Sequence, residues 1–357
     1  MTTRIDALRE KLAAEKCGAF ISVAPPVNQY LTGFRGSTSG LLVTAAYAQF
    51  FCDSRYTEQA GSEVAGCEIE EAKGAIPALL GKRLKELGCP DAAYDDAGLT
   101  VSQLRAVEGE FPGGLKALPE LVSRLRQVKS PEEIDQIRAA QALAEGVLAD
   151  VLDTIAEGIP EREVAARMEY MFRQRGASGA SFPTIALFGA RSSLPHGEPG
   201  GTRLGPGDIV LLDFGCRLDG YCSDLTRTFA FGTIPGTWFE EIYELTLTAQ
   251  AIALDTIRPG MKGREVDGVA RRLIAEAGYG AHFGHGLGHG VGIEIHEGPR
   301  LHAESDAVLE PGMVVTVEPG IYLPGRGGVR IEDMVVVTGD GCRNLTTAPK
   351  ELKVLTT

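Results

Sequence analysis

Short apolar runs alternate with helical stretches along the first part of the chain. The apolar runs have the four- or five-residue length of buried strands and lie at 19–23, 41–44, 49–52 and 91–94. Apolar residues with helical spacing mark the segments at 55–64, 76–87 and 101–111. This mixture predicts a compact α/β domain over residues 1–126.

A long amphipathic helix follows this first region. Ser130-Pro131-Glu132-Glu133 combines a hydroxyl cap, a proline at the first helical position and an acid three residues after the cap. Apolar residues then recur at helical spacing up to Ile155, and Gly158 is the expected stop. We therefore place a domain boundary just before this helix, with a second domain over residues 127–357.

The second domain contains a faint internal repeat. Residues 206–215 and 311–320 share the form Pro-Gly-x-(Ile/Val)-Val-x-(Leu/Val)-acid-x-Gly, and their acids, Asp213 and Glu318, are 105 positions apart. Upstream, Arg-Glu-Val occurs at 162–164 and at 264–266, 102 positions apart. A repeat this long excludes a solenoid. The expected fold class is α+β, with duplicated helix–hairpin halves related by a pseudo-twofold axis, preceded by the smaller α/β domain.

The duplication places four acids at two equivalent positions. In the first half, an Asp-Gly turn at 219–220 separates strands that carry Asp213 and Asp224 across the ladder from each other. The second half carries Glu318 and Glu332 on the corresponding strands. A pseudo-twofold axis would gather these carboxylates in an apolar interior, where they repel one another unless positive charge arrives. Two divalent cations would supply that charge, although arginine pairing is the simpler explanation for any single acid.

Composition narrows the class of protein. A net charge of −13 without a basic tract argues against extended contact with nucleic acid or an anionic membrane. No run of about 18 apolar residues exists to span a bilayer, and the N-terminus lacks the apolar core of a signal peptide. The seven cysteines are scattered without a Cys-x-x-Cys pair, which favours a reducing, cytoplasmic location over a disulfide framework or a thiolate zinc site.

All six histidines lie between residues 196 and 302. The segment 284–297 holds His285, His289 and His296 among glycines, which allow backbone and metal to approach closely. A single histidine in such a loop is more often structural. Three of them beside four placed acids favour a metal site, because neutral imidazole binds zinc, manganese or cobalt.

Together these motifs resemble the M24 "pita-bread" metallopeptidases, in the Xaa-Pro branch that contains prolidase and aminopeptidase P. The resemblance covers essentially the whole chain. It rests on the stretches Leu-Pro-His-Gly at 194–197, Leu-Asp-Phe-Gly at 212–215, Ser-Asp-Leu-Thr-Arg-Thr at 223–228, Gly-Leu-Gly-His-Gly-Val-Gly at 286–292, Val-Glu-Pro-Gly-Ile-Tyr at 317–322 and Val-Arg-Ile-Glu-Asp at 329–333. Tyr-Leu-Thr-Gly-Phe at 30–34 and Asp-Ser-Arg-Tyr at 53–56 resemble the creatinase-like N-terminal domain of that branch.

The resemblance implies a catalytic site with two divalent metal ions. Asp213 would bind one metal, Asp224 and Glu332 would bridge both, and His289 and Glu318 would complete the shell of the second. A hydroxide bridging the metals would be the nucleophile, and Glu318 would accept and return its proton. All five ligand positions match the family pattern, which argues against a metal-free relative.

Further residues have implied roles around this centre. His196 and His296 would bind the substrate amide and stabilise the tetrahedral intermediate, while His285 would line the pocket. Arg330 is a further substrate-binding candidate, but it shares a strand face with Glu332 and more simply steadies the acids.

The choice of substrate depends on Arg300. A dipeptidase must bind the free carboxylate of a C-terminal proline, and arginine suits that planar anion. Glu-Gly-Pro-Arg at 297–300 resembles the Glu-x-Pro-Arg stretch of microbial prolidases, and this resemblance assigns the carboxylate to Arg300. A solvated charge, or an ion pair with Glu297 or Glu304, is the alternative.

The expected function is therefore an Xaa-Pro dipeptidase, which hydrolyses the imide bond of dipeptides that end in proline. An Xaa-Pro aminopeptidase acting on longer peptides and a non-catalytic peptide-binding relative are the alternatives. The ligand set favours manganese over zinc or cobalt because it is rich in carboxylates. The resemblance also implies a homodimer, in which Arg35, Arg55 and Tyr56 of one subunit would face the substrate of the other.

Overall fold

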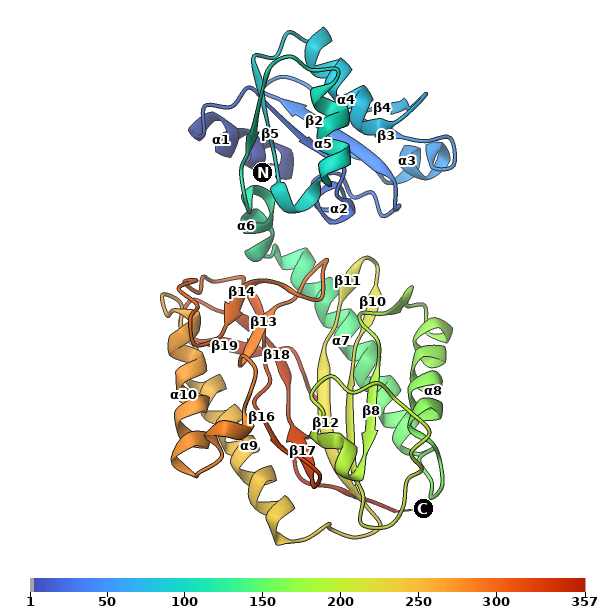
Figure 1. The fold of residues 1–357 in the computed structure, drawn as a ribbon, viewed down its shortest axis with the longest axis vertical. Helices are drawn as coiled ribbons and strands as arrows, with labels where there is room; N and C mark the ends of the chain where they lie inside the picture. Colours follow the sequence, from blue (N-terminus) through green and yellow to red (C-terminus); the bar gives the residue numbers. More distant parts are fainter. Residues whose placement is uncertain (1–2, 357) are drawn as a thin grey trace. The chain divides into compact units, whose positions relative to one another are not determined.

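The structure is a computed structural model that describes residues 3–356. The chain divides after Arg126 into two compact units, and each is described by itself. Figure 1 shows the course of the chain through both units. Within residues 3–356, no helix has the length and apolar character needed to cross a membrane.

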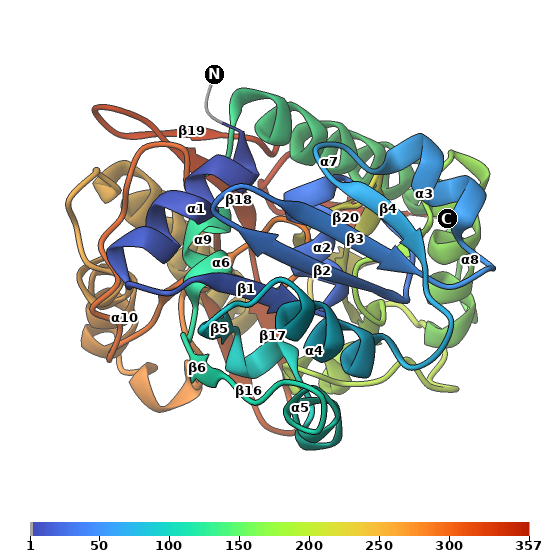
Figure 2. The same ribbon diagram turned by 90° about the horizontal axis from the view of Figure 1, so that it is seen from above.

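A six-stranded mixed sheet forms the first unit (Figure 2). Its strands are β1 (Ala19–Ser22), β2 (Ser39–Thr44), β3 (Ala48–Cys52), β4 (Glu68–Glu71), β5 (Asp91–Tyr94) and β6 (Gly114–Ala117), in the order β4-β3-β2-β1-β5-β6. β2 is antiparallel to β1 and β3, whereas the β3–β4, β1–β5 and β5–β6 pairs are parallel. The helices are α1 (Arg4–Ala14), α2 (Pro25–Thr32), α3 (Thr57–Glu63), α4 (Ile76–Glu86), α5 (Val101–Glu108) and α6 (Leu121–Gln127), with a 3-10 turn, η1, at Asp96–Gly98.

The central strands of this sheet match the apolar runs of the sequence. Leu80 of α4 and Val107 of α5 are fully buried in one cluster with Ile21 and Leu42 of the sheet, so both helices cover the same face. The two edge strands, β4 and β6, were not predicted, because they are polar and mostly exposed. An edge strand needs only one hydrogen-bonded neighbour and tolerates charge, so its sequence carries little signal.

The helix predicted to begin at Ser130 is α7 (Pro131–Leu152). Its capping box forms as expected: the Ser130 side chain accepts from the Glu133 amide, and the Glu133 carboxylate accepts from the Ser130 amide. The helix ends at Leu152, earlier than the apolar pattern indicated. Ile155 is 4% exposed and belongs to the same core, but it lies in the turn that follows the helix.

The second unit repeats one arrangement twice. The first half contains α7, α8 (Glu161–Gln174) and a sheet in the order β20-β12-β9-β8, made of β8 (Ile185–Phe188), β9 (Ile209–Phe214), β12 (Leu225–Phe231) and β20 (Val354–Leu355). The second half contains α9 (Thr237–Thr256), α10 (Gly263–Glu276) and a sheet in the order β14-β13-β15-β18-β19, made of β13 (Gly288–Gly290), β14 (Glu297–Leu301), β15 (Val314–Val317), β18 (Asp333–Val337) and β19 (Cys342–Asn344). In Figure 1 the strands of this unit lie between α8 on one side and α9 and α10 on the other.

Smaller elements complete the unit. They are β7 (Gly179–Ala180), β10 (Cys216–Leu218) and β11 (Tyr221–Cys222) in one short sheet, β16 (Gly320–Leu323) and β17 (Gly327–Arg330) in another, and two 3-10 turns, η2 (Gly189–Ser193) and η3 (Gly280–His282). Asp219 and Gly220, between β10 and β11, have φ values of 48° and 87°. This is the predicted Asp-Gly turn, whose two central residues need positive φ.

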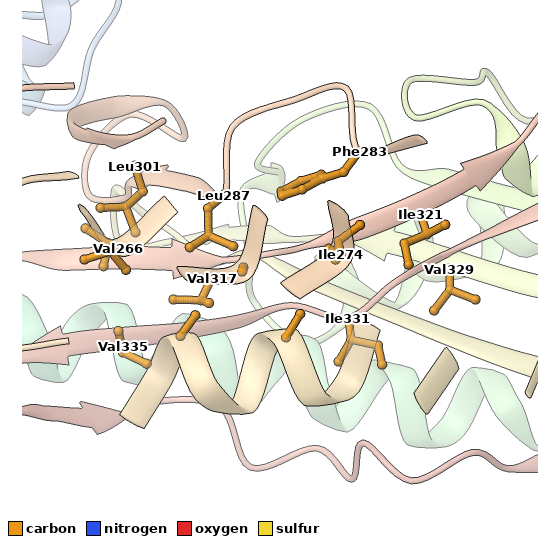
Figure 3. Packing of buried hydrophobic residues seen from close by; sticks show 14 of the residues in the cluster. Val266, Ile274, Phe283, Leu287, Leu301, Val317, Ile321, Val329, Ile331 and Val335 are labelled. Atoms are coloured by element: carbon orange, nitrogen blue, oxygen red, sulfur yellow. The ribbon is translucent and has the colours of Figure 1, made fainter. Parts of the chain in front are cut away.

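Each half has its own apolar core. Figure 3 shows the core of the second half, where Val266 and Ile274 of α10 pack with Leu287, Val317 and other strand residues. The first half has a separate cluster that joins α7 and α8 to β8, β9 and β12. The cluster of the second half also takes in Ile209 of β9 and Ala230 of β12, so the two halves share apolar packing as well.

Candidate metal centre

Breaks in the predicted long strands position the acids. The strand expected to carry Asp224 after the Asp-Gly turn is interrupted at residues 223–224, and Asp224 lies directly before β12. A Cβ on Gly215 would lie 1.8 Å from the carbonyl oxygen of Ser223, so only glycine allows the backbones to come this close. Glu318 follows β15 and Glu332 precedes β18 in the same manner. Chain breaks thus turn these side chains out of the regular ladders.

The ladder of the first hairpin shows how Asp224 is placed relative to Asp213. The ladder between β9 and β12 places Thr226, and not Asp224, directly opposite Asp213. Asp224 lies beyond the end of this ladder, yet its carboxylate still lines the same cavity as Asp213. This follows from the predicted Asp-Gly turn: with residues 219 and 220 at its centre, Asp213 pairs with Thr226, and the β10–β11 and β9–β12 ladders keep one register.

Acids and one histidine from both halves converge. Ligand atoms of Asp224, His289 and Glu332 all lie within 4.8 Å of one another. The Nε2 atom of His289 is 3.5 Å from Asp224 Oδ2 and 3.4 Å from Glu318 Oε1. Asp213 lines the same cavity. The structure therefore brings together all five residues that the sequence marked as metal ligands.

Hydrogen bonds orient these groups. His289 donates from Nδ1 to the carbonyl oxygen of Gly290 at 3.0 Å, which leaves the Nε2 lone pair facing the acids. Thr226 donates its hydroxyl to Glu332 Oε2 at 2.7 Å, and Thr316 donates to Glu318 Oε1 at 3.1 Å. Each threonine hydroxyl binds one oxygen of a glutamate, and the other oxygen of that glutamate remains available to another partner.

The electrostatics of this cluster call for added positive charge. Burial and the neighbouring acids raise the pKa values of Asp224 and Glu332 well above their usual range. Burial raises the pKa of Glu318 to about 8 and lowers the pKa of His289 to about 3. Both effects disfavour the charged form of a group that is removed from water.

The donor set fits divalent cations. Asp213 Oδ1 and Glu332 Oε1 are buried and have no hydrogen-bond partner among the described residues. Such orphaned carboxylate oxygens are costly unless something binds them. Four carboxylates and one imidazole form a ligand set for two hard or borderline cations. Residues Asp213, Asp224, His289, Glu318 and Glu332 are therefore the ones that would hold them.

Arg330 supports the acid cluster through hydrogen bonds. It is 2% exposed, and it donates to Thr226 Oγ1 at 3.1 Å, to Tyr322 Oη at 2.6 Å and to Asp213 Oδ2. Tyr322 in turn lies 2.9 Å from Nε2 of His285, whose Nδ1 is 2.7 Å from the Gly286 carbonyl oxygen. Both ring nitrogens of His285 are thus occupied, and burial lowers its pKa to about 4. The geometry makes Arg330 a support for the acids.

The raised pKa of Glu318 predicts a pH dependence of the metal-free protein. An acid whose pKa is higher in the folded state stabilises the fold below its unfolded value and loses that contribution as the pH rises through about 8. His289 is neutral in both states above pH about 7 and adds no change there. We expect the melting temperature of chelator-treated protein to fall from pH 7 to pH 9. The decrease should be smaller in E318Q; an equal decrease would contradict the assignment.

A cavity of about 590 Å³ opens onto the cluster. His196, which follows η2, and His296 of the segment before β14 are exposed and line it, and the rings of His289 and His296 meet at 4.4 Å between centroids. Phe182, Pro183 and Ile185 give it an apolar wall. The cavity therefore combines a polar, histidine-bearing side with an apolar side.

Arg300 also faces this cavity. It is exposed, and no ion pair of its guanidinium with a described residue is found. The expected competitor for it, Glu297, is instead buried in an ion pair with Lys129, with Nζ 2.6 Å from Oε1. This removes one alternative for Arg300, and its positive charge lowers the pKa values of His289 and His296 as a secondary effect after burial.

Sequence reasoning missed several members of the site. Tyr322 and Thr226 lie within the quoted motifs, but their spacing does not predict that Tyr322 binds Arg330 or that Thr226 binds Glu332. His302 lines the cavity as well. The confinement of every histidine to one region was a signal that could have included it.

Comparisons with known proteins agree with this geometry. Residues 135–339 match the family model "Metallopeptidase family M24", and residues 4–128 match "Creatinase/Prolidase N-terminal domain". The chain is 37% identical to an Xaa-Pro dipeptidase of Lactobacillus delbrueckii subsp. lactis over 351 residues, which cover 94% of each chain. Among solved structures, it is similar to an Xaa-Pro dipeptidase from Bacillus anthracis, with a TM-score of 0.95, 40% identity and 99% coverage of both chains. It is also similar to an X-Pro aminopeptidase from Thermotoga maritima, with a TM-score of 0.89, 36% identity and coverage of 97% and 99%.

Proposed function

Because this chain belongs to metallopeptidase family M24, we propose that it is an Xaa-Pro dipeptidase, which hydrolyses the imide bond of dipeptides with a C-terminal proline. The observation that carries the proposal is the placement of Arg300, without an ion-pair partner among the described residues, in the same cavity as the acid cluster. A dipeptide presents its free carboxylate at a fixed distance from the bond to be cut. A single arginine at that distance can select for it.

Asp213, Asp224, His289, Glu318 and Glu332 would hold two divalent cations. Cations bound there would neutralise the acids, depress the pKa of water towards neutrality and polarise the scissile carbonyl. The intact set of five ligands argues against a non-catalytic peptide-binding relative.

The chain's own residues would then perform the remaining tasks. Glu318 holds or releases a proton, since it lines the cavity while Thr316 orients its Oε1. His196 and His296 have exposed rings that can hydrogen-bond the substrate amide and the oxygen on which charge develops. The apolar wall of Phe182, Pro183 and Ile185 limits the access of bulk water.

The finer assignments are also proposals. Manganese suits a shell of four carboxylates and one imidazole better than zinc, which prefers nitrogen and sulfur ligands. A cytoplasmic location is consistent with the seven cysteines, all of which have free thiols. A homodimer is proposed from the family resemblance alone. In that dimer Arg35, Arg55 and Tyr56 are the candidates for residues that face the partner's substrate.

A substrate panel tests the proposed function. Metal-loaded protein is incubated with Ala-Pro, Ala-Pro-Ala and Met-Ala-Ser, and release of the first residue is followed. We expect rapid turnover of Ala-Pro and little of the others. Turnover of Ala-Pro-Ala without Ala-Pro would instead identify an Xaa-Pro aminopeptidase, and turnover of Met-Ala-Ser would contradict the requirement for proline.

A further inference from the structure

Among the helices that the structure describes, two carry a fully buried carboxylate outside the metal cluster, one on the second helix of each half: Glu161 of α8 and Asp267 of α10. Each is paired with an arginine, and each accepts from at least one backbone amide of a segment that carries a histidine of the site. We propose that these carboxylate–arginine clamps are positioning devices with separate tasks: Glu161 sets the substrate histidine His196, and Asp267 sets the metal ligands His289 and Glu318. This inference rests on the proposed function.

The first clamp closes the loop that contains His196. The amide of Phe188, where the loop starts, donates to Glu161 Oε1 at 2.9 Å, and the amide of Gly200, where it ends, donates to Oε2 at 2.7 Å. Arg191, within the loop, lies 3.0 Å from the same carboxylate. The Glu161 side chain therefore binds the segment at residues 188, 191 and 200. The exposed His196, which lines the cavity, lies between these points.

The second clamp holds the segment that precedes β13. Asp267 accepts from the Leu287 amide at 3.1 Å and binds Arg271 through both oxygens, at 2.7 and 2.8 Å. Arg271 also donates to the carbonyl oxygens of His285, at 2.7 Å, and Phe283, at 3.0 Å. The pair thus satisfies three backbone groups of one irregular turn, which would otherwise have no partner in a regular ladder.

Leu287 connects this clamp to the metal ligands. Its carbonyl oxygen accepts from the amide of Glu318 at 2.8 Å, and His289 follows it by two residues. Its side chain is fully buried in the core beside Val317 (Figure 3), so the backbone at this point cannot shift alone. A displacement at Asp267 would reach both ligands through one residue, Leu287.

One difference between the clamps predicts different effects of replacing them. The Glu161 loop contains no metal ligand, whereas the Asp267 segment leads to two. The hydrogen-bond partners given above for these two carboxylates are all N–H donors. Replacing either carboxylate with an amide therefore points the NH2 group of the new side chain at another N–H donor. Mutation of a residue that orients a metal ligand typically lowers metal affinity or activity by about 10–100-fold.

The test compares E161Q and D267N with the wild type and with E163Q and E276Q, which change exposed glutamates of the same two helices. Binding of Mn²⁺ to metal-free protein is measured by titration calorimetry, and Ala-Pro hydrolysis gives kcat and KM. We expect D267N to weaken Mn²⁺ binding by about 10-fold or more, and E161Q to lower kcat/KM by about 10-fold or more with unchanged Mn²⁺ affinity. Both controls should match the wild type.

Equal losses of Mn²⁺ affinity in E161Q and D267N would overturn the division of tasks, and wild-type behaviour of both would overturn the clamps. If either variant does not fold, R191Q and R271Q remove the partly exposed arginine of each pair and should show the same split. The two proposals remain distinguishable: a wild type that binds Mn²⁺ but does not cleave Ala-Pro refutes the dipeptidase, while the D267N titration still decides the second clamp.

Discussion

Replacing Glu332 with glutamine is expected to reduce Ala-Pro hydrolysis by about 10³-fold or more, because metal-centred catalysis supplies several kcal/mol of transition-state stabilisation. Glu332 is 1% exposed, and its Oε1 has no partner among the described residues, so that oxygen is available to a cation. An amide of the same shape carries no charge and has only one oxygen. It would therefore hold divalent cations less tightly than the carboxylate does.

The same variant should fold at least as well as the wild type when metal is absent. Burial and the neighbouring acids raise the pKa of Glu332 well above its usual range, so an uncharged side chain suits the empty cluster. Metal content measures the loss of cation binding, kcat/KM measures the loss of hydrolysis, and the melting temperature of the metal-free protein measures its stability. E310Q, at an exposed position in the same half, is the matched control. An E332Q protein with two bound metals and wild-type turnover would refute the ligand assignment.

Replacing Arg300 with alanine is expected to raise the Michaelis constant for Ala-Pro by about 10–100-fold. A hydrogen bond to a charged group contributes about 1.5–3 kcal/mol, which corresponds to that range. The guanidinium lies in the cavity without an ion pair among the described residues, so its loss leaves no buried acid unpaired. The effect should therefore appear in substrate binding and leave the fold unchanged.

Ala-Pro-amide makes this test specific, since it keeps the imide bond and lacks the carboxylate. R300A should lower the preference for Ala-Pro over Ala-Pro-amide, while R343A, at an exposed arginine of β19, should keep it. If R300A changes the kinetics of both substrates equally, Arg300 has another task and the choice of a dipeptide loses its support.

The sequence predicted the parts of the fold whose signals are local. The capping box at Ser130 and the Asp-Gly turn at 219–220 both formed as expected, because each depends on side chains within four residues. The polar edge strands β4 and β6 escaped notice, since their pairing is decided by the neighbouring strand. The break at Asp224 accompanies a close approach of the Gly215 and Ser223 backbones across the hairpin, which the apolar pattern of the strands does not encode.

The candidate site, too, could be predicted only where the sequence carried a signal for it. The duplicated acids could be predicted to converge because the repeat supplies long-range information that a single motif lacks. Arg330 illustrates the limit: its strand position suggested a support for the acids, but its bonds to Tyr322 and Asp213 come from tertiary packing. Glu161 and Asp267 look like ordinary helix residues in the sequence, and only their complete burial identifies them.

Stepwise addition of Mn²⁺ to metal-free protein, with bound metal and Ala-Pro hydrolysis followed together, tests the central claim most directly. The buried cluster of Asp213, Asp224, His289, Glu318 and Glu332 predicts no turnover without metal and a maximal rate only when two ions are bound per chain. Hydrolysis of Ala-Pro by the metal-free protein, or a fully metal-loaded protein without activity towards Ala-Pro, would contradict it.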